Sequence, residues 1–160
     1  MTARLVDLSH PFGDGEGAYP GLPQPRVAAH LTREASRGHY AEGTEFAIDA
    51  ITMVGNTGTY VDAPWHRYAG GTDLAGLPLA SLADLPAVVV RVPAGGPRGV
   101  DVDALAPLAG AVAGAAVLLH TGWDERWGTP GYAEPAPFLT EAGARWLVEQ
   151  RVAQVGVDAV

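Results

Sequence analysis

The chain contains no cysteine, which excludes disulfide bonds, thiolate metal ligands and a cysteine nucleophile. A long apolar segment is also missing. The longest apolar run, residues 109–119, falls far short of the roughly 20 residues that a membrane helix needs, and its valines and leucines suit a buried strand. The N-terminus reaches Asp7 without the apolar stretch of a signal peptide. We therefore expect a cytoplasmic protein with no membrane partner.

Basic side chains are few, with 10 lysines and arginines against 18 acidic residues and a net charge of −8. The phosphate backbone of a nucleic acid would be repelled on average, and no basic cluster offsets this charge. We therefore expect no nucleic-acid partner, and we attribute the acidity to solubility.

What remains is the composition of a folded protein. The 160 residues are 48% hydrophobic, which predicts one domain, residues 1–160, with a core of its own. Glycine (21) and proline (13) are frequent and fall mostly in the first hundred residues. That half should be rich in loops and turns.

The second half of the chain alternates between strand and helix patterns. β-branched and apolar runs predict strands, and aspartate or threonine ahead of apolar residues predicts helix starts. The expected order is strand, helix, strand, helix, strand over residues 87–92, 101–108, 115–120, 140–150 and 152–160. This βαβαβ order predicts an α/β fold with parallel strands and right-handed crossovers.

The first half is less regular. Residues 4–10 and 45–54 read as strands, and their pairing is open. The glycines of residues 13–21 lack the strand–turn–helix context of a nucleotide loop, so we expect a flexible loop there. No G-x-S-x-G elbow is present, which disfavours a serine hydrolase.

The stretch GNTGTYVDAPWH, residues 55–66, carries the candidate site. Asn56, Tyr60, Asp62 and His66 occupy even positions, yet an extended chain would separate residues 56 and 62 by about 20 Å. A shared site therefore requires the chain to curl, which the glycines permit. At helical i, i+4 spacing, Asn56 and Tyr60 would lie about 6 Å apart.

These residue types suit acid–base chemistry better than a tight metal site. Asp62 could orient His66, and His66 could act as the general base. Tyr60 or Asn56 could donate a hydrogen bond to a developing oxyanion. Only Asp62 and His66 are of the residue types that zinc and related metals prefer. These few ligands would hold a metal weakly, with Asp62 as the metal ligand. The alternative stays open that Asp62 forms a structural turn and His66 is a surface histidine.

The motif resembles the signature of the cyclase family that includes the kynurenine formamidases and isatin hydrolase. That signature reads H-x-G-T-H-x-D-x-P-x-H. The matching residues are Gly58, Thr59, Asp62, Pro64 and His66. Three further segments resemble the family: residues 7–21, residues 118–128, in which His120 replaces a usual arginine, and residues 139–158.

The resemblance implies an α/β domain of the swivelling β/β/α type with a mixed sheet, usually dimeric or tetrameric. It implies metal-dependent hydrolysis of an amide or lactam attached to an aromatic group. The two motif histidines and the aspartate would bind zinc or manganese, and His66 corresponds to the acid–base residue.

This sequence departs from the family pattern in two places. Asn56 and Tyr60 stand where the two metal-binding histidines belong, so only Asp62 carries over as a ligand. A later histidine and glutamate of the family would lie beyond Val160, and we expect a domain without the family's C-terminal segment. The cofactor stays open between one divalent metal (Zn or Mn) and none. We expect that Asn56 and Tyr60 replaced the two histidines together and serve a common role, because both are polar groups that can form hydrogen bonds inside a site.

Aromatic side chains gather near the candidate site in the sequence. Trp65 lies in the motif, and Trp123, Trp127, Tyr132 and Phe138 lie in one long loop. They could form walls for a flat aromatic or polyketide-like ligand, with Trp65, Trp123, Trp127 and Asn56 binding substrate. Equally, they could cover the core or a subunit interface.

The expected function is that of an arylformamidase-like hydrolase or a metal-independent cyclase. Its substrate would be a small aromatic amide, lactam or polyketide-like carbonyl compound. Catalysis would rest on His66, Asp62 and Tyr60, in a homodimer or homotetramer. The alternative is a non-catalytic ligand-binding protein or subunit that retains the cyclase fold.

Overall fold

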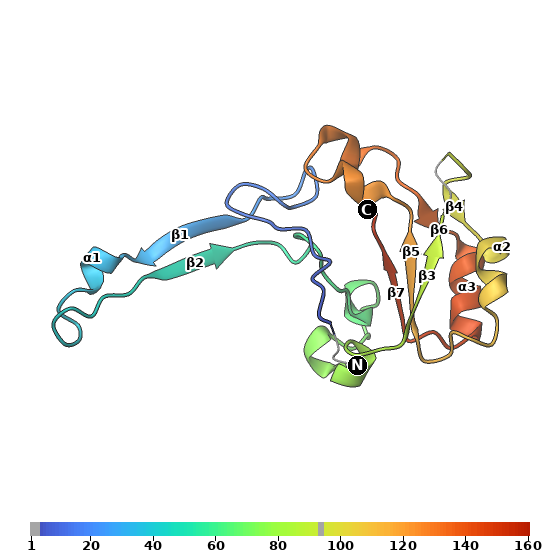
Figure 1. Cartoon of the computed structure of the whole chain (residues 1–160), viewed down its shortest axis with the longest axis horizontal. Coiled ribbons are helices and arrows are strands. Elements are labelled where there is room, and N and C mark those ends of the chain that lie inside the picture. Colours follow the sequence, from blue (N-terminus) through green and yellow to red (C-terminus); the bar gives the residue numbers. More distant parts are fainter. Residues whose placement is uncertain (1–3, 93–94) are drawn as a thin grey trace. The chain divides into compact units, whose positions relative to one another are not determined.

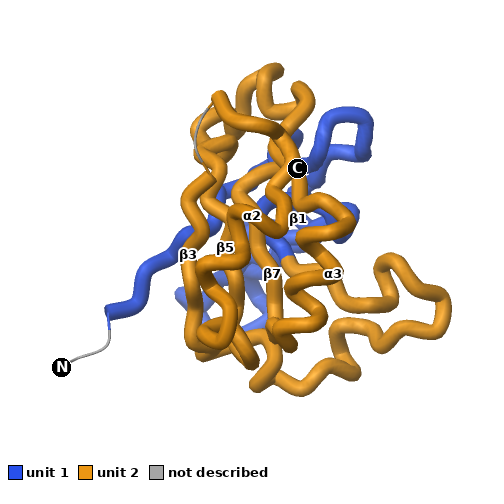
Figure 2. Tube along the Cα trace, turned by 90° about the vertical axis from the view of Figure 1, so that its right-hand side faces the viewer, with its two compact units in different colours: residues 1–60 blue, residues 61–160 orange. Residues whose placement is uncertain are grey.

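The computed structural model describes residues 4–92 and 95–160 of the chain. It divides into two compact units, residues 1–60 and residues 61–160, which Figure 2 shows in different colours. The described part of each unit has strands of its own, and the two units are described separately.

Unit 1 is built around a two-stranded antiparallel ribbon. Strand β1 (Arg26–Leu31) pairs with β2 (Ile48–Thr52), and an irregularity in the register lies between Ala29 and Leu31. The short helix α1 (Arg33–Ser36) follows β1 and is capped by the Thr32 side chain, which accepts a hydrogen bond from the backbone N–H of Ala35. Figure 1 shows α1 at the far end of the ribbon.

The end of this ribbon is closed by a buried serine. Ser36 is fully buried; its hydroxyl donates to the carbonyl of Arg33 at 2.7 Å and accepts from the N–H of Phe46 at 2.9 Å. The rings of Tyr40 and Phe46 meet edge to face, with centroids 5.5 Å apart. The connection between β1 and β2 is therefore held by contacts of its own.

The predicted strand at residues 45–54 is confirmed as β2. Its partner is β1, a strand that the sequence analysis did not predict. The predicted strand at residues 4–10 is wrong, because these residues form no ladder. Leu5 is 97% exposed, and the carboxylate of Asp7 accepts a hydrogen bond from the backbone N–H of Ser9. This local bond offers the backbone an alternative to strand pairing.

Unit 2 contains a three-stranded parallel sheet in the order β3-β5-β7. Its strands are β3 (Ala87–Arg91), β5 (Ala116–His120) and β7 (Gln154–Val157). Helices α2 (Val102–Leu105) and α3 (Glu141–Glu149) lie between them in sequence. The predicted βαβαβ order of the second half is confirmed, and with it an α/β fold that mixes parallel and antiparallel sheets.

The predicted caps position both helices. The carboxylate of Asp101 accepts from the N–H of Val102, and the Thr140 hydroxyl accepts from the N–H of Gly143 at 3.0 Å. A small parallel pair, β4 (Gly99–Val100) with β6 (Phe138–Leu139), flanks these helix starts. Unit 2 also contains short 3-10 turns at Pro64–His66, Leu74–Gly76, Leu79–Ser81, Ala106–Leu108, Trp123–Arg126 and Pro130–Ala133.

The core of unit 2 lies between the sheet and its helices. Figure 1 shows α2 and α3 on the same side of the three strands. Alternate strand residues point to this side, as the period of two requires. The buried side chains of the core are Val90, Val100, Leu105, Val112, Val117, Leu119 and Leu147. None of the described helices is long and apolar enough to cross a membrane.

A carboxylate fixes the loop that leaves the central strand. Asp158, directly after β7, accepts hydrogen bonds from the N–H and hydroxyl of Thr121 and from the N–H of Gly122, at 2.6–2.9 Å. Burial raises the pKa of the Asp158 carboxyl, but these hydrogen bonds outweigh burial, and the pKa is lowered overall. The ionised form therefore stabilises the folded state.

Replacing Asp158 with asparagine should lower the free energy of unfolding at pH 7 by about 1 kcal/mol, because half-buried donors lose a charged acceptor. The folded-state pKa lies below the ordinary value of 3.8, so this contribution is present above about pH 4 and is lost as the pH falls through the lowered pKa. Urea unfolding in EDTA at pH 7, 5 and 3.5 measures it. Asp103→Asn, at an exposed carboxylate, is the control; an equal loss in both variants would contradict the assignment.

Candidate functional site

The first half of the motif is a curled loop in unit 1. Gly58 has φ +64°, and its N–H donates to the carbonyl of Gly17 at 2.8 Å. Thr57 is buried and forms a β-bridge with Ala18. The hydroxyl of Thr59 accepts from the N–H of His10 at 3.1 Å. The segment at residues 10–18 thus holds this half of the motif in place.

This curl brings Asn56 and Tyr60 together, as their spacing predicts. The side-chain amide of Asn56 donates to the phenol oxygen of Tyr60 at 2.9 Å. Asn56 is half-buried and Tyr60 is 50% exposed. The phenol proton is therefore left to donate to another group. The pair is a neutral hydrogen-bonded unit.

The second half of the motif lies in unit 2 and brings Asp62 and His66 into contact. His66 closes the 3-10 turn Pro64–His66, and its Nδ1 lies 3.1 Å from Oδ1 of Asp62. The two side chains are 53% and 48% exposed, respectively. A carboxylate only accepts, so Nδ1 carries a proton in this contact. In the neutral ring, Nε2 is then the basic nitrogen.

Among the described residues, Nε2 of His66 has no hydrogen-bond partner, so it is available to a substrate or a water. A histidine oriented through Nδ1 by a carboxylate, with Nε2 open, is the arrangement that accepts and returns a proton. The geometry predicted for Asp62 and His66 is thus present, and their catalytic roles stay a prediction.

The motif does not fit the metal that the family resemblance implies. The amide nitrogen of Asn56 faces the phenol oxygen of Tyr60, and neither an amide nor a neutral phenol is a strong ligand for zinc or manganese. Among the residues that the structure describes, neither Asp62 nor His66 belongs to a group of three ligand-capable side chains. We therefore route no chemical step through a metal at this motif.

The aromatic residues of the long loop contact each other. The Trp127 and Tyr132 rings pack edge to face at 5.1 Å, and the Trp123 indole N–H donates to the carbonyl of Tyr132 at 3.1 Å. The Arg126 guanidinium lies 3.9 Å from the centre of the Trp123 ring. These contacts support the structural alternative for Trp123 and Trp127. Trp65, 64% exposed on the turn that carries His66, has more surface to offer a ligand.

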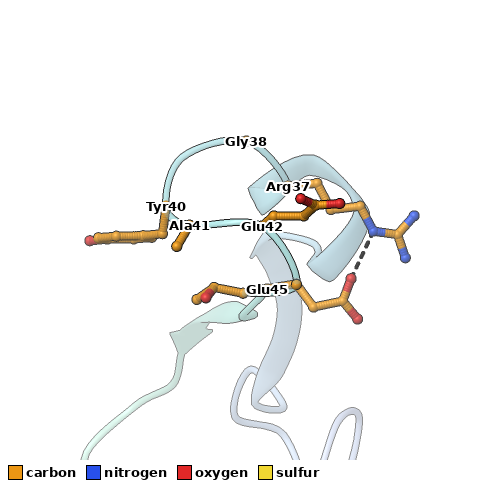
Figure 3. Close-up of a pocket in the computed structure, with 8 residues that line it drawn as sticks. Arg37, Gly38, Tyr40, Ala41, Glu42 and Glu45 are labelled. Carbon is orange, nitrogen blue, oxygen red and sulfur yellow. Dashed lines mark hydrogen bonds and ion pairs between the residues drawn. The ribbon is translucent and has the colours of Figure 1, made fainter.

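One open pocket lies at the end of the ribbon in unit 1. It is lined by residues 37, 38 and 40–45, and Figure 3 shows the Arg37–Glu45 ion pair, 2.7 Å long, beside it. None of the predicted site residues lines this pocket. The surface that lines the pocket is mainly apolar, although three charged side chains contribute to it, those of Arg37, Glu42 and Glu45.

A second cluster of ligand-capable side chains was not predicted. His120, Asp124 and Asp158 converge in unit 2. The sequence marked His120 only as a replacement for an arginine. The signal that could have found the cluster is the position of His120 and Asp158 at the carboxyl ends of neighbouring parallel strands, where ligands bind in α/β sheets.

Comparison with known proteins addresses the fold and the family. The chain superposes on a structure described as a potential metal-dependent hydrolase with cyclase activity, with 25% identity, a TM-score of 0.73 and coverage of 96% of this chain and 67% of that one. An isatin hydrolase bound to the product analogue thioisatinate is 20% identical, with a TM-score of 0.72 and coverage of 95% of this chain and 65% of that one. Isatin hydrolase A from Ralstonia solanacearum is 23% identical, with a TM-score of 0.68 and coverage of 98% of this chain and 66% of that one.

The chain thus spans about two thirds of the length of these solved structures. No curated protein sequence matches it. The likeness in structure confirms the predicted cyclase-type α/β fold. The family model described as "Putative cyclase" matches residues 6–160, which is nearly the whole chain. The chain therefore belongs to this cyclase family.

Proposed function

We propose that this protein is a hydrolase or cyclase that acts on a small carbonyl compound, with His66 as general acid and base and Asp62 as its orienting partner. The observation that carries the proposal is the 3.1 Å contact between Nδ1 of His66 and Oδ1 of Asp62. Membership of the cyclase family and the likeness to isatin hydrolases support the reaction class. The substrate class is an aromatic amide, lactam or cyclisable polyketide-like compound.

For an amide or lactam, each step balances with His66 as the carrier of one proton. Nε2 takes a proton from water as the water oxygen attacks the carbonyl carbon. The tetrahedral intermediate then collapses, the C–N bond breaks, and Nε2 returns its proton to the leaving nitrogen. The products are a carboxylic acid and an amine. Asp62 stabilises the imidazolium that exists between these steps, since its carboxylate lies against Nδ1.

Trp65 is the aromatic residue that we propose to contact the substrate. It lies next to His66 in the same 3-10 turn and exposes 64% of its surface. An exposed tryptophan beside the catalytic group can cover one face of a flat aromatic ring. Trp123 and Trp127, which pack within their own loop, stay predicted substrate contacts with less support.

The position of His66 depends on a glycine five residues later. The N–H of Trp65 donates to the carbonyl of Thr72 at 3.1 Å, which ties the turn to the following chain. A Cβ added at Gly71 would lie 2.6–2.7 Å from the backbone of Pro64 and Trp65. Real Cβ atoms do not approach this closely, so Gly71 permits the contact that sets the turn.

A non-catalytic binding protein is the second candidate. Asp62 and His66 are each about half exposed, whereas general acid–base catalysis gains strength when water is excluded. In this reading the family fold is retained and the pair binds a ligand without turning it over. We also propose a homodimer or homotetramer, supported by the exposed apolar residues Val27 and Ile51 of the ribbon. A cytoplasmic location remains part of the proposal, supported by the lack of cysteine.

Replacing His66 with glutamine should lower turnover by about 10²–10⁴-fold, because proton transfer loses its carrier. Turnover is measured on N-formyl aromatic amines, isatin-like lactams and cyclisable polyketides, with and without chelator. His30→Gln, on strand β1, is the matched control and should retain full activity. If no compound turns over and ligand affinity is unchanged in His66→Gln, the non-catalytic candidate is the correct one.

Replacing Tyr60 with phenylalanine tests the oxyanion role predicted for Tyr60 and Asn56. The variant keeps the ring but removes the oxygen that accepts the Asn56 hydrogen bond. We expect turnover to fall by about 10–100-fold, within the range for loss of one hydrogen bond made to a developing charge. Ligand binding and turnover equal to those of the unmodified protein would count against the role, and against a coherent substitution at these two positions.

Replacing Gly71 with alanine should displace the turn that carries His66 and lower turnover at least tenfold, because its Cβ would meet backbone atoms of Pro64 and Trp65. Gly70→Ala is the matched control, since a Cβ there meets nothing within 4 Å. The carbon-bound proton resonances of the His66 ring should shift in the first variant and stay in place in the second. Identical spectra and rates in both variants would refute the positioning role.

A further inference from the structure

Three ligand-capable side chains meet at the carboxyl end of the parallel sheet in unit 2. His120 is the last residue of β5, Asp124 lies in the 3-10 turn Trp123–Arg126, and Asp158 directly follows β7. One ligand atom from each lies within 4.8 Å of the others. The parallel pairing of β5 with β7 creates this convergence, since it delivers residues 120 and 158 to the same sheet edge.

Asp124 supplies an independent sign that something is bound here. Its Oδ1 is inaccessible to solvent and has no hydrogen-bond partner among residues 4–92 and 95–160. A carboxylate oxygen that is cut off from water without a donor is costly, more so when it is charged. A cation bound by the Asp124 carboxylate would offset that cost.

Asp158 is already fixed in position. Its two oxygens accept the hydrogen bonds from Thr121 and Gly122 described above. Hydrogen bonds of this kind orient a carboxylate ligand before a metal arrives. The N–H of Thr121 is shared between both oxygens, so three donors meet the roughly four lone-pair sites of the carboxylate, and one site is left for a metal.

We propose that His120, Asp124 and Asp158 bind a divalent first-row transition metal such as Mn²⁺ or Zn²⁺. Two carboxylates and one imidazole are a preferred donor set for these ions. Ligand atoms lie about 2.0–2.2 Å from such a metal. In the tetrahedral arrangement that such ions adopt, the ligand atoms would lie about 3.4 Å from each other. The three atoms now lie within 4.8 Å of one another, so binding requires the side chains to close by up to about 1.4 Å, which rotation of exposed or half-buried side chains can supply. This site does not depend on the function proposed for Asp62 and His66.

Arg91 competes with the metal for His120. Its Nη1 lies 3.2 Å from Nδ1 of His120, its register partner on β3. A guanidinium only donates, so Nδ1 accepts and the neutral ring carries its proton on Nε2. A ring nitrogen must be free of a proton to bind metal. Binding therefore breaks the Arg91 contact, which is exposed and contributes little.

The test is to titrate the full chain with metal. Binding of MnCl₂ is measured as the loss of the free Mn²⁺ signal in electron paramagnetic resonance, and binding of ZnCl₂ is measured by calorimetry. One equivalent should bind. Asp124→Asn should weaken affinity at least tenfold, and His120→Arg, which replaces the imidazole with a group that cannot bind metal, should abolish binding. Arg91→Ala should tighten it by up to about fivefold, because a competing cation is removed.

The controls are Asp103→Asn, which removes the same charge at an exposed site, and Asp62→Asn in the motif. Both should bind one equivalent with unchanged affinity. Unfolding in EDTA verifies that every variant is folded. Absence of binding at millimolar metal, or binding that survives both Asp124→Asn and His120→Arg, would overturn the proposal. Loss of binding in Asp62→Asn alone would place the metal at the motif and overturn it as well.

Discussion

The parallel register of β3, β5 and β7 is the constraint on which unit 2 depends. It places Val90, Val117 and Leu119 on the side covered by α2 and α3, where their burial stabilises the fold. The same register brings Arg91, His120 and, one step beyond β7, Asp158 to one edge. A single pairing pattern therefore builds the core on one face and collects the polar groups at the carboxyl end. The hydrogen bonds from Thr121 and Gly122 to Asp158 lock the two outgoing chains together at that edge.

The second half of the chain could be predicted from sequence because its signals are local. The β-branched run at β3, the Asp101 and Thr140 caps and the spacing of strands and helices all agree with the structure. The first half could not be predicted as well. Strand β1 has alanines and a histidine where a clear alternation would help, and its partner lies beyond a long, self-contained connection. The segment at residues 4–10 shows the opposite error, since apolar residues without a pairing partner do not make a strand.

The candidate site divides in the same way. Contacts between residues four apart, Asn56 with Tyr60 and Asp62 with His66, follow from a short curl in the chain, and the sequence was enough to predict them. What holds the curl comes from elsewhere: the carbonyl of Gly17 for the first pair, and the close approach of Gly71 for the second. The convergence of Asp124 with Asp158 is also long-range, and it emerges only once the strands are paired.

The buried serine at the end of the β1–β2 ribbon has a consequence for how this part of the molecule can change. Ser36 joins the two sides of the connection through its hydroxyl, so the tip keeps its form without help from the strands. Adding a pair of residues to each strand would carry the tip outward by about 7 Å while leaving its internal bonds untouched. The length of the ribbon and the structure of its end are therefore independent, and substitutions or insertions can change one without changing the other.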